Sequence, residues 1–151
     1  MYSLEETTYK DHPVLRLLKD GNPVLGDNLK GLRFGIKKAK MIINAMAQIE
    51  IFFNSNGANP SMNTEIHINQ GKYDMPCYCI KRINFQIRDI IINRAYLKIR
   101  SNNRSNNISI GFGLVKAEGL ITLKDQIEDF IRKNDIGIIF QRNVSYGYFN
   151  Y

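Results

Sequence analysis

Two stretches of the chain share one pattern: Phe34–Phe53 reads FGIKKAKMIINAMAQIEIFF, and Phe112–Ile131 reads FGLVKAEGLITLKDQIEDFI. At an offset of 78 residues, nine of the twenty aligned positions are identical. Self-similarity at a fixed offset is the sequence signature of a repeated structural unit. We therefore expect a single domain over residues 1–151, with repeat one at about 13–56 and repeat two at about 63–134.

Each copy has the apolar spacing of an amphipathic helix, with apolar residues at i, i+3, i+4 and i+7. In the first copy these residues are Ala39, Ile42, Ile43, Met46, Ile49 and Phe53; in the second they are Ala117, Leu120, Ile121, Ile127 and Ile131. Gly35 and Gly113 stand where an extended segment turns into the helix. The repeated Lys-Ala pairs at 38–39 and 116–117 are better explained by helix packing than by ligand contact.

The residues before each copy predict antiparallel strands, more completely in the second half. Four segments of the second half alternate or are short and apolar: Thr64–Asn69, Cys77–Arg88, Ala95–Arg100 and Ile108–Phe112. The first half offers only residues 14–19 and 32–34, after a polar stretch, 1–12, interpreted as a loosely attached leader. Residues 136–140, IGIIF, are a candidate for a buried strand. The predicted fold class is α+β, with a ββββα second unit and a shortened first unit.

The net charge of +7 is concentrated in one segment. Between Met75 and Ala117 there are eight Lys or Arg residues and one acid, Asp89. A basic excess confined to one region is expected of a protein that binds a polyanion. The alternative is a solvated basic surface that only keeps the protein in solution. No apolar run has the length of a membrane span, and the polar N-terminus does not fit a secretory signal, so we expect a cytoplasmic location.

The sequence predicts neither an enzyme nor a metal or cofactor site. The motifs GxxxxGK[ST], HExxH and GxSxG are absent. Cys77 and Cys79 form one CxC pair with no second pair to complete a zinc site, so we interpret them as reduced thiols. His12 and His67 are too far apart in sequence to argue for a shared site.

One face of an antiparallel sheet commonly packs on helices while the other is free to meet a ligand. In the strand at 95–100, the expected outer side chains are Tyr96, Lys98 and Arg100. In the strand at 77–88, Ile83, Phe85 and Ile87 are expected to face inward, and Arg82, Asn84, Gln86 and Arg88 outward. The predicted nucleic-acid-binding residues are these seven outer side chains together with Tyr78, Lys81 and Arg104. Cations bind phosphates, a tyrosine ring stacks on bases, and amides bond to base edges.

The order of strands followed by an F-G-x-x-K-A helix, occurring twice, resembles the superfamily of Whirly proteins, PUR-repeat proteins and positive-cofactor transcription coactivators. The resemblance covers Thr64–Lys133 well and residues 13–53 in part. It implies that each unit has four strands and a helix, and that two units pack about a pseudo-two-fold axis. It also implies a curved strand surface that binds single-stranded DNA or RNA, without catalysis.

These observations favour a single-stranded nucleic-acid-binding protein, with DNA preferred to RNA as the expected ligand. We expect it to act in replication, recombination or transcription, in a bacterial cell or a virus-infected host cell, as a homo-oligomer. The alternative is a structural or adaptor subunit that assembles through its aromatic C-terminal tail, which holds Tyr146, Tyr148, Phe149 and Tyr151.

Overall fold

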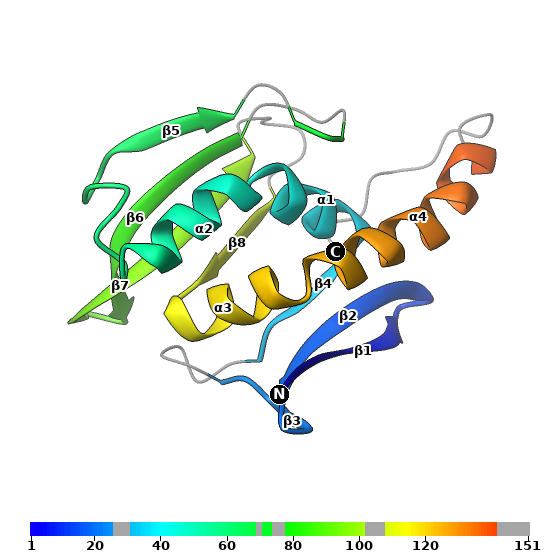
Figure 1. Ribbon diagram of the computed structural model, residues 1–151, viewed down its shortest axis with the longest axis horizontal. Helices are drawn as coiled ribbons and strands as arrows, with labels where there is room; N and C mark the ends of the chain where they lie inside the picture. The colour runs from blue at the N-terminus through cyan, green and yellow to red at the C-terminus, as the bar shows by residue number, and fades with distance from the viewer. Residues whose placement is uncertain (26–30, 69–70, 74–77, 102–107, 142–151) are drawn as a thin grey trace.

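The computed structural model describes residues 1–25, 31–68, 71–73, 78–101 and 108–141 (Figure 1). Within these residues the fold class is α+β, with antiparallel sheets and four helices. The predictions made for Cys77, Arg104 and the aromatic tail fall outside the described residues. None of the helices in the described part of the chain is both long and apolar enough to cross a membrane.

The first sheet, called sheet 1, is built around strand β2 (His12–Lys19). Strand β1 (Tyr2–Tyr9) pairs with β2 along its whole length, and the short strands β3 (Asn22–Pro23) and β4 (Arg33–Gly35) pair with different parts of β2. The prediction of a loosely attached leader at residues 1–12 is therefore wrong, and so is the prediction of a shortened first unit, because sheet 1 has four strands like the sheet of the second half. Although β1 is mostly polar, Tyr2 and Leu4 pack against the core and give the strand an inner face.

The second sheet, called sheet 2, is a four-stranded antiparallel meander. Its strands are β5 (Glu65–Ile68), β6 (Tyr78–Ile87), β7 (Ile90–Ser101) and β8 (Ser109–Phe112), paired in chain order. All four predicted strands are present, and β7 is longer than expected. Its inner face carries Ile80, Leu97 and Ile99, which are completely buried.

Both predicted helices are present, each divided into two by one non-helical residue. In the first half, Ala45 separates α1 (Ile36–Asn44) from α2 (Met46–Asn54). In the second half, Leu123 separates α3 (Leu114–Thr122) from α4 (Lys124–Gln141). The strand predicted at residues 136–140 is wrong, because α4 continues through this segment. A short apolar run fits a buried helix as well as a strand, so its composition could not decide between them.

The helices pack so that each sheet is covered mainly by the helices that follow the other sheet in the chain (Figure 1). Helix α3 lies against sheet 1, where a Cβ at Gly119 would press on Tyr2 and Leu17. The hydroxyl of Tyr2 also donates a hydrogen bond to the carbonyl of Val115, 3.1 Å away. Helix α2 lies over sheet 2 in Figure 1, while α1 lies beside α4, and Gly57, just after α2, approaches Ala95 of β7. One continuous core therefore joins both halves.

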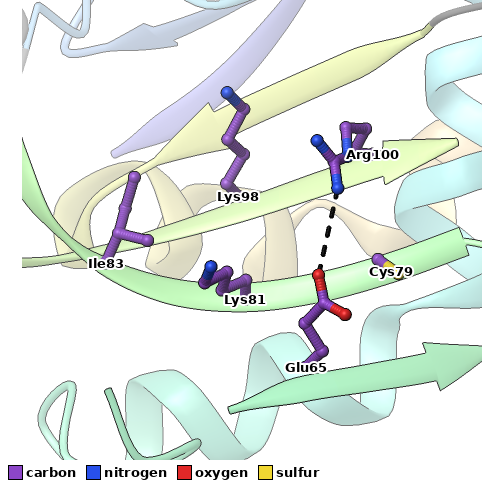
Figure 2. A pocket seen from close by; sticks show the side chains of 6 residues that line it. All are labelled: Glu65, Cys79, Lys81, Ile83, Lys98 and Arg100. Atoms are coloured by element: carbon purple, nitrogen blue, oxygen red, sulfur yellow. Dashed lines mark ion pairs between the residues drawn. The ribbon is translucent and has the colours of Figure 1, made fainter. Parts of the chain in front are cut away.

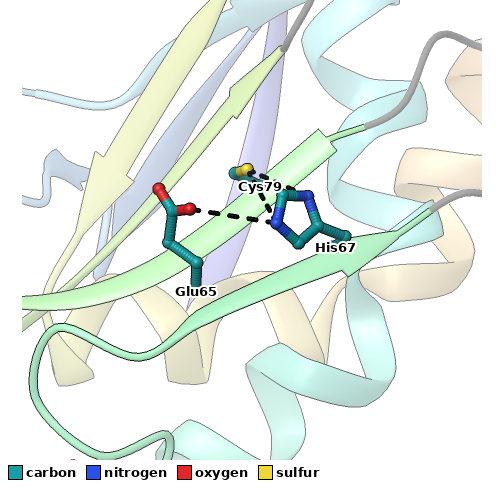
Figure 3. A group of neighbouring side chains, drawn as sticks. All are labelled: Glu65, His67 and Cys79. Carbon is teal, nitrogen blue, oxygen red and sulfur yellow. Dashed lines mark hydrogen bonds and ion pairs between the residues drawn. The ribbon is translucent and has the colours of Figure 1, made fainter.

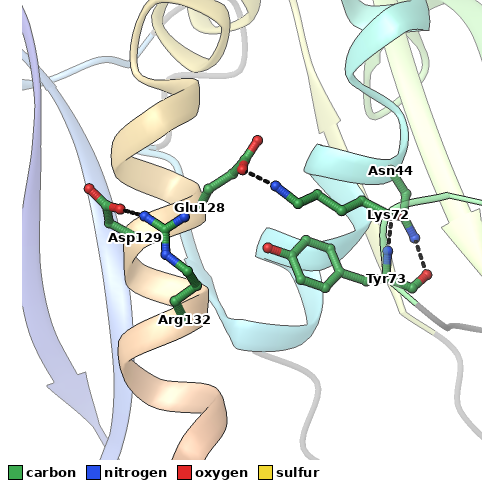
Figure 4. Close-up of polar contacts among 6 residues, drawn as sticks. All are labelled: Asn44, Lys72, Tyr73, Glu128, Asp129 and Arg132. Carbon is green, nitrogen blue, oxygen red and sulfur yellow. Dashed lines mark hydrogen bonds and ion pairs between the residues drawn. The ribbon is translucent and has the colours of Figure 1, made fainter.

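Polar contacts hold the described end of the β5–β6 connection against the helices (Figure 4). The Asn44 side chain donates to the Tyr73 carbonyl at 3.0 Å and accepts from the Tyr73 N–H at 2.9 Å. Lys72 forms an ion pair with Glu128 of α4. Because β6 begins a few residues later, these contacts help to orient sheet 2 on its helix layer.

Candidate nucleic-acid interface

The candidate interface is the outer face of sheet 2, the face turned away from the helices. Side chains directly opposite each other on paired strands share a face. One row across the sheet contains Glu65, Lys81, Lys98 and Gly111, and the next contains His67, Cys79, Arg100 and Ser109. The inner residues Ile80 and Ile99 lie between these rows, so the rows themselves point outward.

A pocket of about 190 Å³ opens on this face (Figure 2). Its lining residues are Glu65, Cys79, Lys81, Ile83, Lys98 and Arg100. Three of the six are cations and one is an anion. Arg100 is 3.9 Å from the Glu65 carboxylate, and both side chains are about half exposed. We call this feature the basic pocket.

The two lysines of the basic pocket are direct cross-strand neighbours, Lys81 on β6 and Lys98 on β7. Like charges placed directly opposite each other destabilise a sheet. On the outer face of sheet 1, the residues opposite each other on β1 and β2 are instead Glu5 and Arg16, which form an ion pair at 2.9 Å. The Lys81–Lys98 pair of sheet 2 is therefore repulsive, whereas the Glu5–Arg16 pair of sheet 1 is attractive. An anion bound between the two lysines would relieve their repulsion.

An aromatic ring lies beside the lysines on the same face. Tyr96 is directly opposite Ile83, two residues before Lys98 on β7. Its ring lies over Gly111 of β8, because a Cβ at residue 111 would overlap with the phenol. The predicted outward direction of Tyr96, Lys98 and Arg100 agrees with this register, as does the burial of Leu97 and Ile99 between them.

Two predicted site residues of β6 lie on the opposite face. Arg82 is directly opposite the buried Leu97, and Asn84 is opposite Ala95, so both point toward the helices. Within the described part of the chain, Arg82 Nε and Asn84 Oδ1 are buried without a hydrogen-bond partner. The prediction that Ile83 faces inward is wrong for the same reason. Residues 82–88 alternate in the phase that would bury Ile83, whereas the register with β7 selects the phase that buries Ile80 and turns Ile83 outward.

The remaining predicted residues are not part of the pocket. Gln86 and Arg88 are exposed near the turn of the β6–β7 hairpin, beyond a break in register after Asn84. Arg88 has a positive φ of 55°, as its place in a tight turn requires. Tyr78 begins β6, directly opposite Ser101, but its side chain is not among the described ones.

A second group of side chains on this face was missed by the sequence analysis (Figure 3). The sulfur of Cys79 is 3.3 Å from Nδ1 of His67, and Nε2 of His67 is 3.8 Å from the Glu65 carboxylate. The three residues come from neighbouring strands, and His67 is directly opposite Cys79. The available signal was the ExH pattern of β5 together with the CxC pattern of β6, since residues two apart share one face of a strand.

Comparison of the chain with protein-family models, curated proteins and solved structures finds no match.

Proposed function

We propose that this protein binds single-stranded nucleic acid through the outer face of sheet 2, with single-stranded DNA preferred to RNA. The observation that carries the proposal is the Lys81–Lys98 pair, two cations held directly opposite each other next to Arg100 and Tyr96. Phosphates would bind at the three cations, and a base would stack on the tyrosine ring. The protein would act without catalysis, in the cytoplasm, in replication, recombination or transcription.

We propose further that the two halves are related units with the pseudo-two-fold arrangement of the superfamily that the sequence resembles. Three features support this relationship. Helices α1 and α3 have nine residues each and begin after Gly35 and Gly113, which are both extended. Each is followed, after a single non-helical residue, by a second helix. Lys116 and the alanines at 39 and 117 are buried at the helix starts, which supports a packing role for the Lys-Ala pairs.

A homo-oligomer belongs to the same proposal. Three isoleucines at the end of the β6–β7 hairpin support it: Ile87 is 38% exposed, Ile90 66% and Ile91 67%. Large aliphatic side chains gathered at an exposed hairpin tip are a typical site of self-association. We assign this tip to contact with a second copy of the chain, which would leave the basic pocket available to the ligand.

The deciding experiment is fluorescence anisotropy of a labelled oligothymidylate titrated with the full chain at several salt concentrations. Log K should fall linearly with log salt, with a slope of about −0.7 for each phosphate neutralised on a single strand. The double variant K81Q/K98Q should bind more weakly and show a slope smaller by about 1.4. The control K19Q/K124Q removes the same charge from the end of β2 and the start of α4, and should keep the wild-type slope.

Two outcomes would count against the proposal. Absence of binding at low salt would exclude nucleic acid as the ligand and leave the adaptor alternative. If K81Q/K98Q and K19Q/K124Q lost the same amount of oligonucleotide affinity, net charge rather than the basic pocket would govern binding. Competition with an oligouridylate of the same length measures the preference for DNA over RNA.

A further inference from the structure

We propose that Glu65, His67 and Cys79 form a binding site for a divalent transition-metal ion, with Zn²⁺ as the expected occupant. This inference goes beyond nucleic-acid binding and does not depend on it. The three side chains supply a carboxylate, an imidazole and a thiolate, which are the three ligand types that zinc takes in proteins.

The spacing of the donor atoms fits a single ion. One oxygen, nitrogen or sulfur atom from each side chain lies within 4.8 Å of the corresponding atoms of the other two. Nε2 of His67 is 4.0 Å from the Cys79 sulfur and 3.8 Å from a Glu65 oxygen. Zinc bonds of about 2.0–2.3 Å at tetrahedral angles place donor atoms about 3.3–3.8 Å apart. Small rotations of the exposed Glu65 and His67 side chains would bring the donor atoms toward these separations.

The sheet holds these ligands in place before an ion binds. Glu65 and His67 are two residues apart on β5, so they project from one face. His67 is directly opposite Cys79 of β6 and Glu65 is directly opposite Lys81, in an unbroken antiparallel register. Ligands carried by paired strands are positioned more rigidly than ligands carried by loops.

The charges around the group also permit a cation. A Glu65 carboxylate and a Cys79 thiolate together balance the charge of Zn²⁺, and His67 binds as a neutral ligand. Arg100 is near the other carboxylate oxygen, Oε1, at 3.9 Å, so Oε2 can bind the ion while that ion pair is kept. Three protein ligands leave a fourth position open to water.

The competing explanation is a thiol–imidazole hydrogen bond that involves no ion, and cobalt(II) distinguishes the two. Metal-free full chain would be titrated with Co²⁺ in the absence of nucleic acid. We expect one equivalent to produce a near-ultraviolet band from thiolate-to-cobalt charge transfer, with visible bands of tetrahedral intensity. One equivalent of Zn²⁺ should abolish both. If no charge-transfer band develops, the site does not exist.

Matched variants assign the ligands. C79S should lose the charge-transfer band, while H67A and E65Q should weaken the affinity for Zn²⁺ by at least about 10–100-fold. His67 and Glu65 are exposed, so these two variants should fold like the wild type, as circular dichroism would verify. The control H12A removes the other histidine of the chain and should bind Zn²⁺ like the wild type. Retention of the band in C79S, or wild-type affinity in H67A, would overturn the proposal.

Discussion

The ring of Tyr96 covers Gly111 on the neighbouring strand, and no side chain larger than hydrogen fits beneath it. The glycine therefore determines where the only described aromatic ring beside the basic pocket lies. Glycine within a strand often marks a site where another group approaches the backbone closely. Here that group is the phenol ring on which a base would stack in the proposed complex.

Replacing Gly111 with alanine should displace this ring and weaken oligonucleotide binding. We expect Y96A to weaken the free energy of oligonucleotide binding by about 1–3 kcal/mol, the contribution of one stacked base. G111A should weaken it by part of that amount. Fluorescence anisotropy at constant salt measures both. The control Y9A removes a tyrosine that lies under Arg33 on sheet 1 and should bind normally. Wild-type affinity in Y96A would show that no base stacks there.

The Lys81–Lys98 pair predicts opposite effects on stability and binding. Lys98→Glu would replace repulsion with attraction, the arrangement that Glu5 and Arg16 already have on sheet 1. We expect the free energy of unfolding to rise by about 0.2–1 kcal/mol while oligonucleotide affinity falls. Urea unfolding and anisotropy on the same preparation give the two values. A variant that loses both stability and affinity would show that Lys98 is needed to maintain the sheet rather than to bind a ligand.

Asn44 connects α1 to the segment that leads into sheet 2. Asn44→Ala would remove both hydrogen bonds to the Tyr73 backbone and leave a partly buried N–H and carbonyl without these partners. The free energy of unfolding should fall by about 1–3 kcal/mol in urea titrations. Asn54→Ala, at the exposed end of α2, is the matched control and should change stability by less than about 0.5 kcal/mol.

Lys37 should make stability depend on alkaline pH. Burial lowers the pKa of Lys37 to about 8 in the folded state, against about 10.4 in the unfolded chain. Between these values the unfolded state binds a proton that the folded state does not, so the contribution of Lys37 to the free energy of unfolding increases with pH. Below about pH 8 both states are protonated, and the cost of burying the ammonium is fully present.

The corresponding measurement is the melting temperature of K37M relative to the wild type from pH 7 to 10.5. The variant should melt higher at pH 7, because it buries no charge, and its advantage should shrink as the pH rises. K37R is the control, since its guanidinium remains charged and cannot produce the increase. A difference between K37M and the wild type that is constant with pH would contradict the assignment.

The isoleucines at the hairpin tip predict the behaviour of the assembly. The double variant I90N/I91N should shift native mass spectra toward smaller species while leaving the stability of one chain within about 0.5 kcal/mol. The control L25N/I51N replaces two other exposed aliphatic side chains, 48% and 45% exposed, away from the tip. If only the control dissociates the assembly, the contact between copies lies elsewhere.

Sequence periodicity predicted the elements that have a strong and unambiguous pattern. The recurring FG segment predicted both helices, because an apolar stripe of period 3.6 over about twenty residues fits no strand. The alternation in β7 gave the correct faces for Tyr96, Lys98 and Arg100, because Leu97 and Ile99 leave only one phase that buries apolar residues. Strand β1 was missed because its sequence, YSLEETTY, has few apolar residues.

Only the tertiary structure decided which side chains meet. The faces of β6 were predicted in the wrong phase because Ile83, Phe85 and Ile87 alternate with polar residues, and only the pairing of Arg82 with the buried Leu97 shows that Ile83 faces outward. His67 and Cys79 are twelve residues apart, and the ExH and CxC patterns do not show that their strands pair, yet the β5–β6 register places the two side chains side by side. The sequence by itself determined most helices and strands and the segment where the positive charge is concentrated, because these features depend on residues close together in the chain. The pocket, the paired lysines and the Glu65–His67–Cys79 group depend on strand register, which is a property of the assembled sheet.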